Sequence, residues 1–597
     1  MRTHYNNELT IKNLNQTVTL NGWVSKARNL GSLLFVDLRD RFGITQLTFH
    51  EKSVYELATT LKNEYVIEVT GKVIERQSKN PNMVTGEIEV LVDSLTILSE
   101  AKQTPIIIND TNNVLEETRL KYRYLDLRGS KQQQYLIKRH EITQAVRKVL
   151  VEKGFYELET PFLGKSTPEG ARDYLVPSRV HPSKFYALPQ SPQMYKQLFM
   201  VAGFEKYFQF AKCFRDEDLR ADRQPEFTQI DIEASFVNEN DIMSFVEEML
   251  RRTFKEVLNI NIETPFLKMP YEHAISKYGS DKPDMRFEML IEDYTNIFKS
   301  VDVPFFNNEE HISGIIASNS SSFTRKKIDE LTNLVKKNHG KALAFIKNTN
   351  NEYTGSIAKF LNEDTFNKLN LKDNEILFLV PGNYDDVKNS LGALRIEVAK
   401  ELDIIDNNSY KFLWVTDWPL LEFDLETNRY YAKHHPFTAP KTIEELRDTP
   451  KEAIARAYDV VLNGYELGGG SIRIHQQAMQ DLMFKTLGFT EQEIKEQFGF
   501  FVDALSYGTP PHGGIALGLD RLTMLMTKTE NIRDVVAFPK TQNARDLMMD
   551  APSFVTDLQL NELHISVAKE DKKDEKKWLY NLGPIFHGGC KSISSKK

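Results

Sequence analysis

Apolar and polar residues alternate along five segments of the first hundred residues, which is the pattern of half-buried β-strands. One segment of helical spacing, Ser53–Lys62, interrupts this series after the third strand. Five strands with a helix after the third is the order of an OB-fold barrel, a fold that often binds oligonucleotides. The expected strands are Thr17–Arg28, Leu33–Arg39, Gly43–Phe49, Val66–Gln77 and Thr85–Leu98.

After the barrel, segments of helical spacing and segments of strand-like alternation follow one another, which predicts an α+β multidomain chain. Prolines cluster in Thr264–Pro283 and the composition changes after Asp284, as expected for an inserted α/β domain. The run KEDKKDEKK near the C-terminus is typical of a solvated or disordered tail. We therefore expect a barrel at 1–104, a hinge at 105–130, a main domain in two parts at 131–283 and 411–566, an insertion at 284–410 and a tail at 567–597.

Composition narrows the class of protein. A chain of 597 residues is too long for one hydrophobic core, and 41% hydrophobic with 27% charged residues is ordinary for a globular protein. Because the formal net charge is −8, any nucleic-acid surface must come from basic residues gathered locally. Two cysteines argue against a disulfide framework and a cysteine-built zinc site. The N-terminus lacks an apolar signal core and no segment is long enough to span a membrane, so we expect a cytoplasmic protein.

The segment Glu226–Phe236 alternates between an apolar and a polar face, because side chains along a strand point to opposite sides. Alternation alone fits a solvent-exposed sheet surface, but the preceding FRDED and the turn RQPEF favour a binding site. We expect Arg215 and Glu217 on a neighbouring strand, where the guanidinium can hold two mutually repelling anions. The polar face consists of Phe227, Gln229, Asp231 and Glu233, and the apolar face of Ile230, Ile232 and Ala234.

A glycine-rich strand followed directly by a helix is predicted at Gly514–Leu525. Arg521 lies in the first turn of that helix, where unpaired N–H groups and the helix dipole favour a phosphate. A surface arginine at a helix start is the plainer alternative, and the preceding glycines favour phosphate binding.

Asn463-Gly464, between two apolar runs, predicts a β-hairpin turn. In that register Val461 pairs with Glu466, and Asp459 is a diagonal neighbour of Glu466 on the same face. Two acids roughly 7–8 Å apart can share a hydrated Mg²⁺ that is also held by phosphate oxygens. The alternative is a pair of exposed acids.

A pocket with two cations is expected nearby. Ser191 is expected to cap a helix in which Gln193 and Lys196 share a face. Arg473 reaches the same pocket only if a bulge at Gly468–Gly470 shifts the alternation of its strand. Lys196 by itself also fits a plain solvated lysine, but two cations together suit a substrate with a negative side chain.

Three separated segments carry a family resemblance: Lys153–Leu163, Phe214–Asp231 and Gly514–Leu525. In this order they resemble the three signature motifs of class II aminoacyl-tRNA synthetases. The segments TPEGARDYLVPSR, QSPQMYKQLFM, HHPF and GYELGGGSIRIH are similar to those of bacterial aspartyl-tRNA synthetases, and the resemblance covers Met1 to Ile565. It implies an OB-fold barrel, an antiparallel-sheet catalytic domain and an inserted α/β domain. The implied reaction joins L-aspartate to ATP, giving aspartyl-adenylate and pyrophosphate, and then transfers aspartate to the 3′ end of tRNA(Asp).

The resemblance also implies roles for individual residues. The catalytic residues would be Arg215, Arg521, Glu466 and Lys196. Aspartate would be bound by Glu169, Ser191, Gln193, Lys196, Arg215, Gln229, Asp231, His434, His435 and Arg473. ATP would be bound by Arg215, Asp216, Glu217, Gln224, Phe227, Glu466, Gly518, Leu519, Asp520 and Arg521, and Mg²⁺ by Asp459 and Glu466.

The partners implied by the resemblance are tRNA(Asp) and a second copy of the chain. A homodimer would form through the first motif, around Pro161, and Leu30 matches forms restricted to the aspartate tRNA. From alternation alone, Phe35 is either a base-stacking platform or a core residue covered by a loop. The anticodon would be read by Arg28, Phe35, Gln46 and Glu89.

Two other functions remain as alternatives. A sister synthetase for asparagine or lysine would leave Lys196 and Arg473 unpaired or repelled by the substrate. A catalytically inactive, RNA-binding relative would be expected to lack motif arginines or metal acids. This chain retains Arg215, Arg521, Asp459 and Glu466.

Replacing Arg215 tests the family role directly. Arg215→Ala should abolish aspartate-dependent ATP–pyrophosphate exchange, because the charge that develops at the α-phosphorus loses its guanidinium. Exchange at a near-normal rate in this variant would overturn the assignment.

Overall fold

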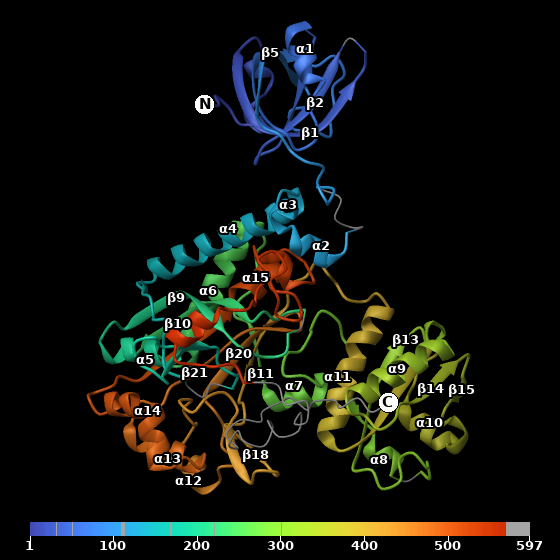
Figure 1. Ribbon diagram of the computed structural model, residues 1–597. Coiled ribbons are helices and arrows are strands. Elements are labelled where there is room, and N and C mark those ends of the chain that lie inside the picture. The colour runs from blue at the N-terminus through green and yellow to red at the C-terminus, as the bar shows by residue number, and fades with distance from the viewer. Residues whose placement is uncertain are drawn as a thin grey trace. The chain divides into compact units, whose positions relative to one another are not determined.

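The computed structural model describes residues 1–31, 33–50, 52–108, 114–166, 170–219, 221–299 and 301–568 (Figure 1). By its internal contacts the chain divides into two compact units, Met1–Gly129 and Ser130–Lys597. Among the described helices, none is long and apolar enough to cross a bilayer. The predicted tail lies almost wholly outside the described residues.

The first unit is built on a closed five-stranded barrel with the strand order β1-β2-β3-β5-β4. The predicted OB-fold order is confirmed, with α1 directly after β3, although α1 ends four residues earlier than expected. Two short helices, α2 (Glu116–Lys121) and α3 (Arg123–Asp126), follow within the same unit. The barrel elements are β1 (Thr17–Asn29), β2 (Leu34–Arg39), β3 (Ile44–Phe49), α1 (Lys52–Ala58), β4 (Val66–Glu75) and β5 (Ile88–Ser99).

The second unit is organised by an eight-stranded sheet in the order β11-β17-β20-β21-β22-β10-β9-β6. Its pairs are antiparallel except for β6 with β9 and β11 with β17, which are parallel. The strands are β6 (Tyr156–Glu157), β9 (Lys206–Phe214), β10 (Glu226–Ser235), β11 (Leu267–Pro270), β17 (Phe412–Thr416), β20 (Ala457–Leu462), β21 (Tyr465–Ile472) and β22 (His512–Gly518).

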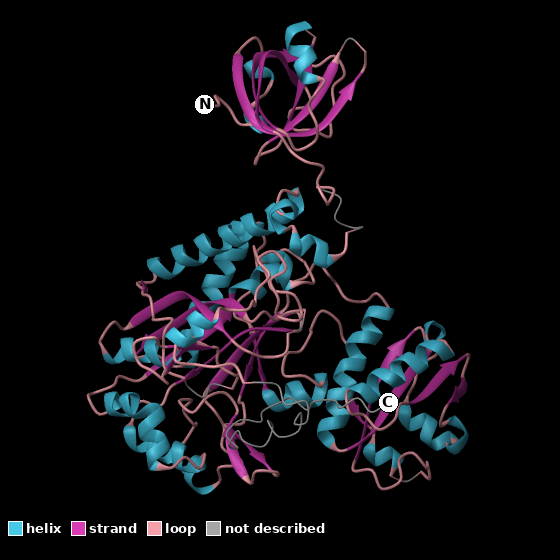
Figure 2. Ribbon diagram, in the orientation of Figure 1, coloured by secondary structure: helices cyan, strands magenta, loops and turns pink. Residues whose placement is uncertain are grey.

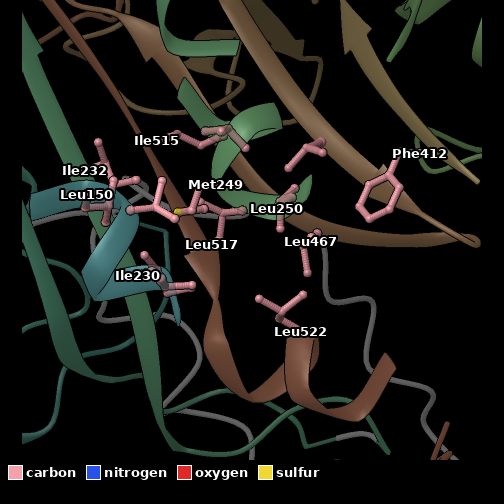
Figure 3. Close-up of a cluster of buried hydrophobic side chains, with 14 of the residues drawn as sticks. Leu150, Ile230, Ile232, Met249, Leu250, Phe412, Leu467, Ile515, Leu517 and Leu522 are labelled. Atoms are coloured by element: carbon pink, nitrogen blue, oxygen red, sulfur yellow. The ribbon is translucent and has the colours of Figure 1, made fainter. Parts of the chain in front are cut away.

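Three helices cover one face of this sheet (Figure 2): α4 (Ser130–Glu152), α6 (Glu239–Leu258) and α15 (Leu519–Met526). Ile230 and Ile232 of β10 pack under them beside Leu517 and Leu522, as Figure 3 shows. The predicted apolar face of β10 is therefore confirmed. Its polar face points to the other side of the sheet, away from these helices.

The part of the sequence between α7 and β17 forms a second, five-stranded sheet with the strand order β12-β13-β16-β14-β15. Its elements fall within the predicted insertion at 284–410, whose limits stay a prediction. Arg395 of α11 is buried and donates to the carbonyls of Phe287 and Met289, which holds α11 against the entry of the insertion. Helix α7 (Tyr271–Tyr278) precedes this region, whose elements are β12 (Glu292–Asp293), α8 (Thr295–Phe298), β13 (His311–Ser318), α9 (Arg325–Lys337), β14 (Ala344–Thr349), β15 (Glu352–Gly355), α10 (Glu363–Leu369), β16 (Glu375–Gly382) and α11 (Tyr384–Glu401).

Shorter elements complete the second unit. They are β7 (Leu175–Pro177), β8 (Phe185–Ala187), α5 (Gln193–Val201), β18 (Leu421–Asp424), β19 (Arg429–Ala432), α12 (Ile443–Asp448), α13 (Gln477–Thr486), α14 (Glu491–Leu505) and α16 (Asp557–Glu562).

The core under α4 and α6 predicts a large mutational effect at Ile232. Ile232→Ala should lower the free energy of unfolding by about 2–5 kcal/mol, because the buried cavity cannot fully collapse. Ile137→Ala, on the more exposed side of α4, should cost less than about 1 kcal/mol. Denaturant unfolding followed by circular dichroism measures both, and equal effects would contradict this packing.

Candidate active site

A cavity of about 390 Å³ opens on the polar side of the eight-stranded sheet. It collects side chains from α5, β10, β21, α15 and the loop after β9. Of the predicted residues, Asp216, Leu519, Asp459 and Arg473 do not line it, and Glu169 lies outside the described residues. The predicted residues that line it are Ser191, Gln193, Lys196, Arg215, Glu217, Gln224, Phe227, Gln229, Asp231, His434, His435, Glu466, Gly518, Asp520 and Arg521.

Two cations and two carboxylates form a buried ion network at one end of the cavity. Lys196 Nζ lies 2.6 Å from Asp231 Oδ1 and 3.3 Å from Glu233 Oε2. Arg473 grips the same Glu233 carboxylate through Nε and Nη2, at 2.9 and 3.1 Å. All four side chains are at most 2% exposed. We call these four residues the ion network below.

The ion network shifts the pKa values of its two acids in opposite directions. Burial raises the pKa of Asp231 despite Lys196. Burial would also raise the pKa of Glu233, but Arg473 and Lys196 together outweigh it and hold that pKa below its usual range. Asp231 Oδ2 has no hydrogen-bond partner among the described residues. The site therefore contains a buried acceptor that suits a cationic donor.

Arg473 is almost completely engaged by the protein. Its Nη1 donates to Ser471 Oγ and points at His435 Nε2, 2.7 Å away in both cases. Burial and Arg473 keep the pKa of His435 well below its usual value, so the imidazole is neutral and accepts this bond. With two bonds to Glu233, four of the five N–H groups of a guanidinium are used. The second N–H on Nη2 has no partner among the described residues.

A β-bulge explains how Arg473 comes to the same face as Glu466. The predicted hairpin turn is confirmed, with positive φ at Asn463 (52°) and Gly464 (85°), as a type I′ turn requires. Val461 pairs with Glu466, but the register shifts before the next pair, Val460 with Gly468. The expected β-bulge is thus present, but at Leu467, directly before the three glycines. It reverses which side chains of β21 point to each face of the sheet after that residue.

Asp459 and Glu466 lie on this face as two carboxylates, and no Lys or Arg of the described residues forms an ion pair with either. Burial, helped by the charge of Glu466, raises the pKa of Asp459 to about 6, although His434 acts in the opposite direction. His434 Nε2 is 3.8 Å from Asp459 Oδ1, and that oxygen accepts no hydrogen bond from the described residues. The opposing residue is Gly469, where a Cβ would lie only 2.6 Å from Oδ1.

The described residues contain no cluster of three or more His, Cys, Asp or Glu side chains that could hold a metal ion. Asp459 and Glu466 therefore supply only part of a coordination shell. This donor set fits Mg²⁺, which usually binds one or two carboxylates and takes its other oxygens from water and phosphates.

The other end of the cavity carries the arginines expected to bind ATP. The Arg215 guanidinium stacks 5.1 Å from the centre of the Phe227 ring. Contrary to expectation, Arg215 and Glu217 lie in the loop after β9, which ends at Phe214. Arg521 Nη1 donates to the Glu466 carbonyl at 2.5 Å, and Nη2 to Asp222 at 3.1 Å.

The loop after β9 also holds residues that the sequence patterns missed. Asp222 and Arg223 line the cavity, and Arg223 lies 3.3 Å from Glu217. The side-chain amide of Gln224 donates to the Lys540 carbonyl and accepts from the Lys540 N–H, so its orientation is fixed. No periodicity marks Asp222 or Arg223, because they lie in an irregular loop.

Helix α5 begins at Gln193, two residues after the predicted cap. The N-cap is Pro192, without a side-chain capping bond, so the prediction of Ser191 as the cap is wrong by one residue, although Ser191 Oγ accepts a hydrogen bond from the Gln193 amide at 3.3 Å. The helix places Gln193 and Lys196 on its buried side, as predicted.

The barrel of the first unit carries a separate row of polar side chains. Arg28 donates to Asp37 at 2.9 Å and to Gln46 at 3.2 Å, and Gln46 donates to Glu89 at 2.5 Å. Arg76, which the sequence patterns missed, donates to Gln46 at 2.6 Å. The neighbour of Arg28 on β2 is Phe35, which alternation places outside the barrel core. The alternative of a core phenylalanine is therefore wrong.

The comparisons with known proteins agree on one family. Residues 115–542 match the profile described as tRNA synthetases class II (D, K and N), and residues 18–98 match the OB-fold nucleic acid binding domain. The chain is 50% identical to "Aspartate--tRNA(Asp/Asn) ligase" of Anoxybacillus flavithermus, over 96% of this chain and 100% of that protein. It is 51% identical to "Aspartate--tRNA ligase" of Oceanobacillus iheyensis, over 94% of this chain and 98% of that protein.

Solved structures share the fold at low sequence identity. Asparaginyl-tRNA synthetase from Pyrococcus horikoshii, complexed with asparaginyl-adenylate, has a TM-score of 0.57 at 20% identity, covering 90% of this chain and 98% of that one. Aspartyl tRNA synthetase from Entamoeba histolytica has a TM-score of 0.56 at 19% identity, covering 89% of this chain and 90% of that one.

The expected fold class and enzyme class are both confirmed by these matches. The alternative of a lysine or asparagine enzyme finds no support among the two relatives, whose names both specify aspartate. The chain belongs to the class II tRNA synthetases, in the family of bacterial aspartate–tRNA ligases.

Proposed function

We propose that this chain activates L-aspartate with ATP, releasing pyrophosphate, and then transfers the aspartyl group to the 3′ end of tRNA(Asp). The ion network carries the proposal for aspartate, because among the described residues Asp231 Oδ2 and one N–H of Arg473 have no partner. Phe227, Arg215 and Arg521 at the other end suit a nucleotide triphosphate.

Aspartate binding would exchange ion pairs inside the ion network. The α-ammonium of the substrate takes the free Oδ2 of Asp231, helped by Ser191 and Gln193. The β-carboxylate takes a donor from Lys196 and the remaining N–H of Arg473, with His434 beside it. Asparagine would present an amide NH₂ group to these cations and leave them without an anion.

ATP binding would use the opposite end of the cavity. Adenine stacks on Phe227, near Glu217 and Gln224. Arg215 holds the α-phosphate and the substrate α-carboxylate together, so that the carboxylate oxygen attacks phosphorus in line and pyrophosphate leaves. Arg521 takes the γ-phosphate and must give up Asp222 to do so.

Asp459 and Glu466 would hold Mg²⁺, which neutralises charge on the leaving pyrophosphate when bound. The unpartnered Oδ1 of Asp459 and the neighbouring Glu466 carboxylate support this assignment. The close approach of Gly469 leaves no room for a side chain that would cover Asp459.

The barrel would read the anticodon through Arg28, Phe35, Gln46 and Glu89, since aromatic rings and amide groups suit unpaired bases. The relative from Anoxybacillus flavithermus is named for both tRNA(Asp) and tRNA(Asn), whereas the one from Oceanobacillus iheyensis is named without a second tRNA. Leu30, the residue that matches forms restricted to the aspartate tRNA, is 72% exposed on the barrel.

A homodimer through the Pro161 region is supported by exposed apolar residues beside it, Tyr156, Phe162 and Leu163. A cytoplasmic location stays a prediction.

Amino-acid-dependent ATP–pyrophosphate exchange tests the function. Aspartate should support exchange, and asparagine or lysine less than about one-hundredth as well. Lys196→Gln should raise the KM for aspartate by roughly a hundredfold with little change in the KM for ATP, because it removes a buried cation. Lys212→Gln, exposed on β9, is the control. Exchange that is supported equally by asparagine would refute the proposal.

The raised pKa of Asp459 predicts a pH dependence with a defined sign. The pKa in the folded protein lies above the usual value, so Asp459 stabilises the metal-free protein below that value and loses this contribution as pH rises through about 6. The Tm of the EDTA-treated wild type, relative to Asp459→Asn, should therefore fall between about pH 4 and about pH 6 and level off above that. Asp417→Asn serves as control, because a hydrogen bond from Lys441 lowers the pKa of that acid. A difference that stays constant over this range would contradict the assignment.

A further inference from the structure

We propose that Arg139 of α4 is a positioning residue for ATP, which acts through Asp520 to set the places of Arg521 and Phe227. This inference rests on the ATP-binding roles proposed above for Arg521 and Phe227. Arg139 is not among the residues that line the cavity.

A closed triangle of contacts joins Arg139, Asp520 and Thr228. Asp520 Oδ2 accepts a hydrogen bond from the Thr228 amide at 2.8 Å. Asp520 Oδ1 forms an ion pair with Arg139 Nη1, and Arg139 Nη2 donates to Thr228 Oγ1 at 3.2 Å. The Asp520 side chain is 5% exposed and that of Arg139 20%. Both carboxylate oxygens of Asp520 are thus engaged by protein groups, which argues against the predicted direct contact of Asp520 with ATP.

The triangle lies where the sheet ends and α15 begins. The pairing of β10 with β22 stops at Gln229 with Gly518, because the chain turns into the helix after Gly518. The Asp520 carboxylate accepts the next amide of β10 in place of a strand carbonyl. A buried carboxylate needs a compensating charge, and Arg139 supplies it from α4.

Two members of the triangle, Thr228 and Asp520, are direct neighbours in the chain of residues proposed to bind ATP. Thr228 follows Phe227, whose ring would stack on adenine. Asp520 precedes Arg521, which would hold the γ-phosphate. The triangle therefore fixes the spacing between the adenine end and the phosphate end of the site. Misplacement of a reacting group by about 1 Å can cost roughly a hundredfold in rate.

Arg139→Ala should raise the KM for ATP in the exchange reaction by roughly tenfold or more, with the KM for aspartate changed less than about twofold. Arg139→Lys keeps the charge but cannot bridge both partners, so it should restore only part of the loss. Arg147→Ala is the matched control, because Arg147 lies on the same helix and is bonded to Glu157 at 2.7 and 2.9 Å. That variant should leave both KM values unchanged.

A double-mutant cycle separates positioning from general destabilisation. If Arg139 acts through Asp520, Arg139→Ala should add little to the ATP defect of Asp520→Asn. Should Arg139→Ala not fold, Arg139→Lys replaces it in the cycle. Additive effects, an unchanged KM for ATP, or equal rises in both KM values with a lowered Tm would overturn the inference.

Arg521→Ala distinguishes a failure of this inference from a failure of the proposed function. Normal exchange in Arg521→Ala would refute the ATP-binding role on which both depend. Impaired exchange in Arg521→Ala together with a normal KM for ATP in Arg139→Ala would refute the inference alone.

Discussion

The buried ion network of Lys196, Asp231, Glu233 and Arg473 is the interaction on which the site depends. Its two cations and two carboxylates balance, whereas any one of them left alone would cost several kcal/mol of desolvation. The four residues come from α5, from β10 and from the position directly after β21, so the network also holds these elements together. A substrate that carries one ammonium and two carboxylates can enter by exchanging partners within it.

The eight-stranded sheet keeps this chemistry apart from the hydrophobic core. On β10, Ile230 and Ile232 pack beneath α4 and α6, while Gln229 and Asp231 face the cavity. Strand β10 therefore stabilises the fold with one face and presents the ligand-binding groups on the other. The bulge in β21 extends this arrangement, because it turns Arg473 to the side of Glu466 without bending the chain out of the sheet.

Much of the fold and part of the site could be predicted from local patterns. The barrel strands begin and end within three residues of the expected limits, since each strand has its own alternation. The turn at Asn463-Gly464 and the helix that begins at Leu519 follow from short-range rules in the same way. Arg215 was expected on a strand and lies in a loop, because nothing local marks where pairing with a neighbouring strand stops.

The sequence by itself determined which residues share a face of a regular strand or helix, because that depends on backbone period wherever no bulge interrupts it, as one does in β21. It also carried the motifs that identify the family. Tertiary structure alone decided which charges meet. Arg473 and Glu233 are 240 residues apart, and Arg521 and Asp222 are 299 apart. Such pairs depend on how strands are ordered in the sheet and on the burial that makes an unpaired charge costly, and neither leaves a periodic trace along the chain.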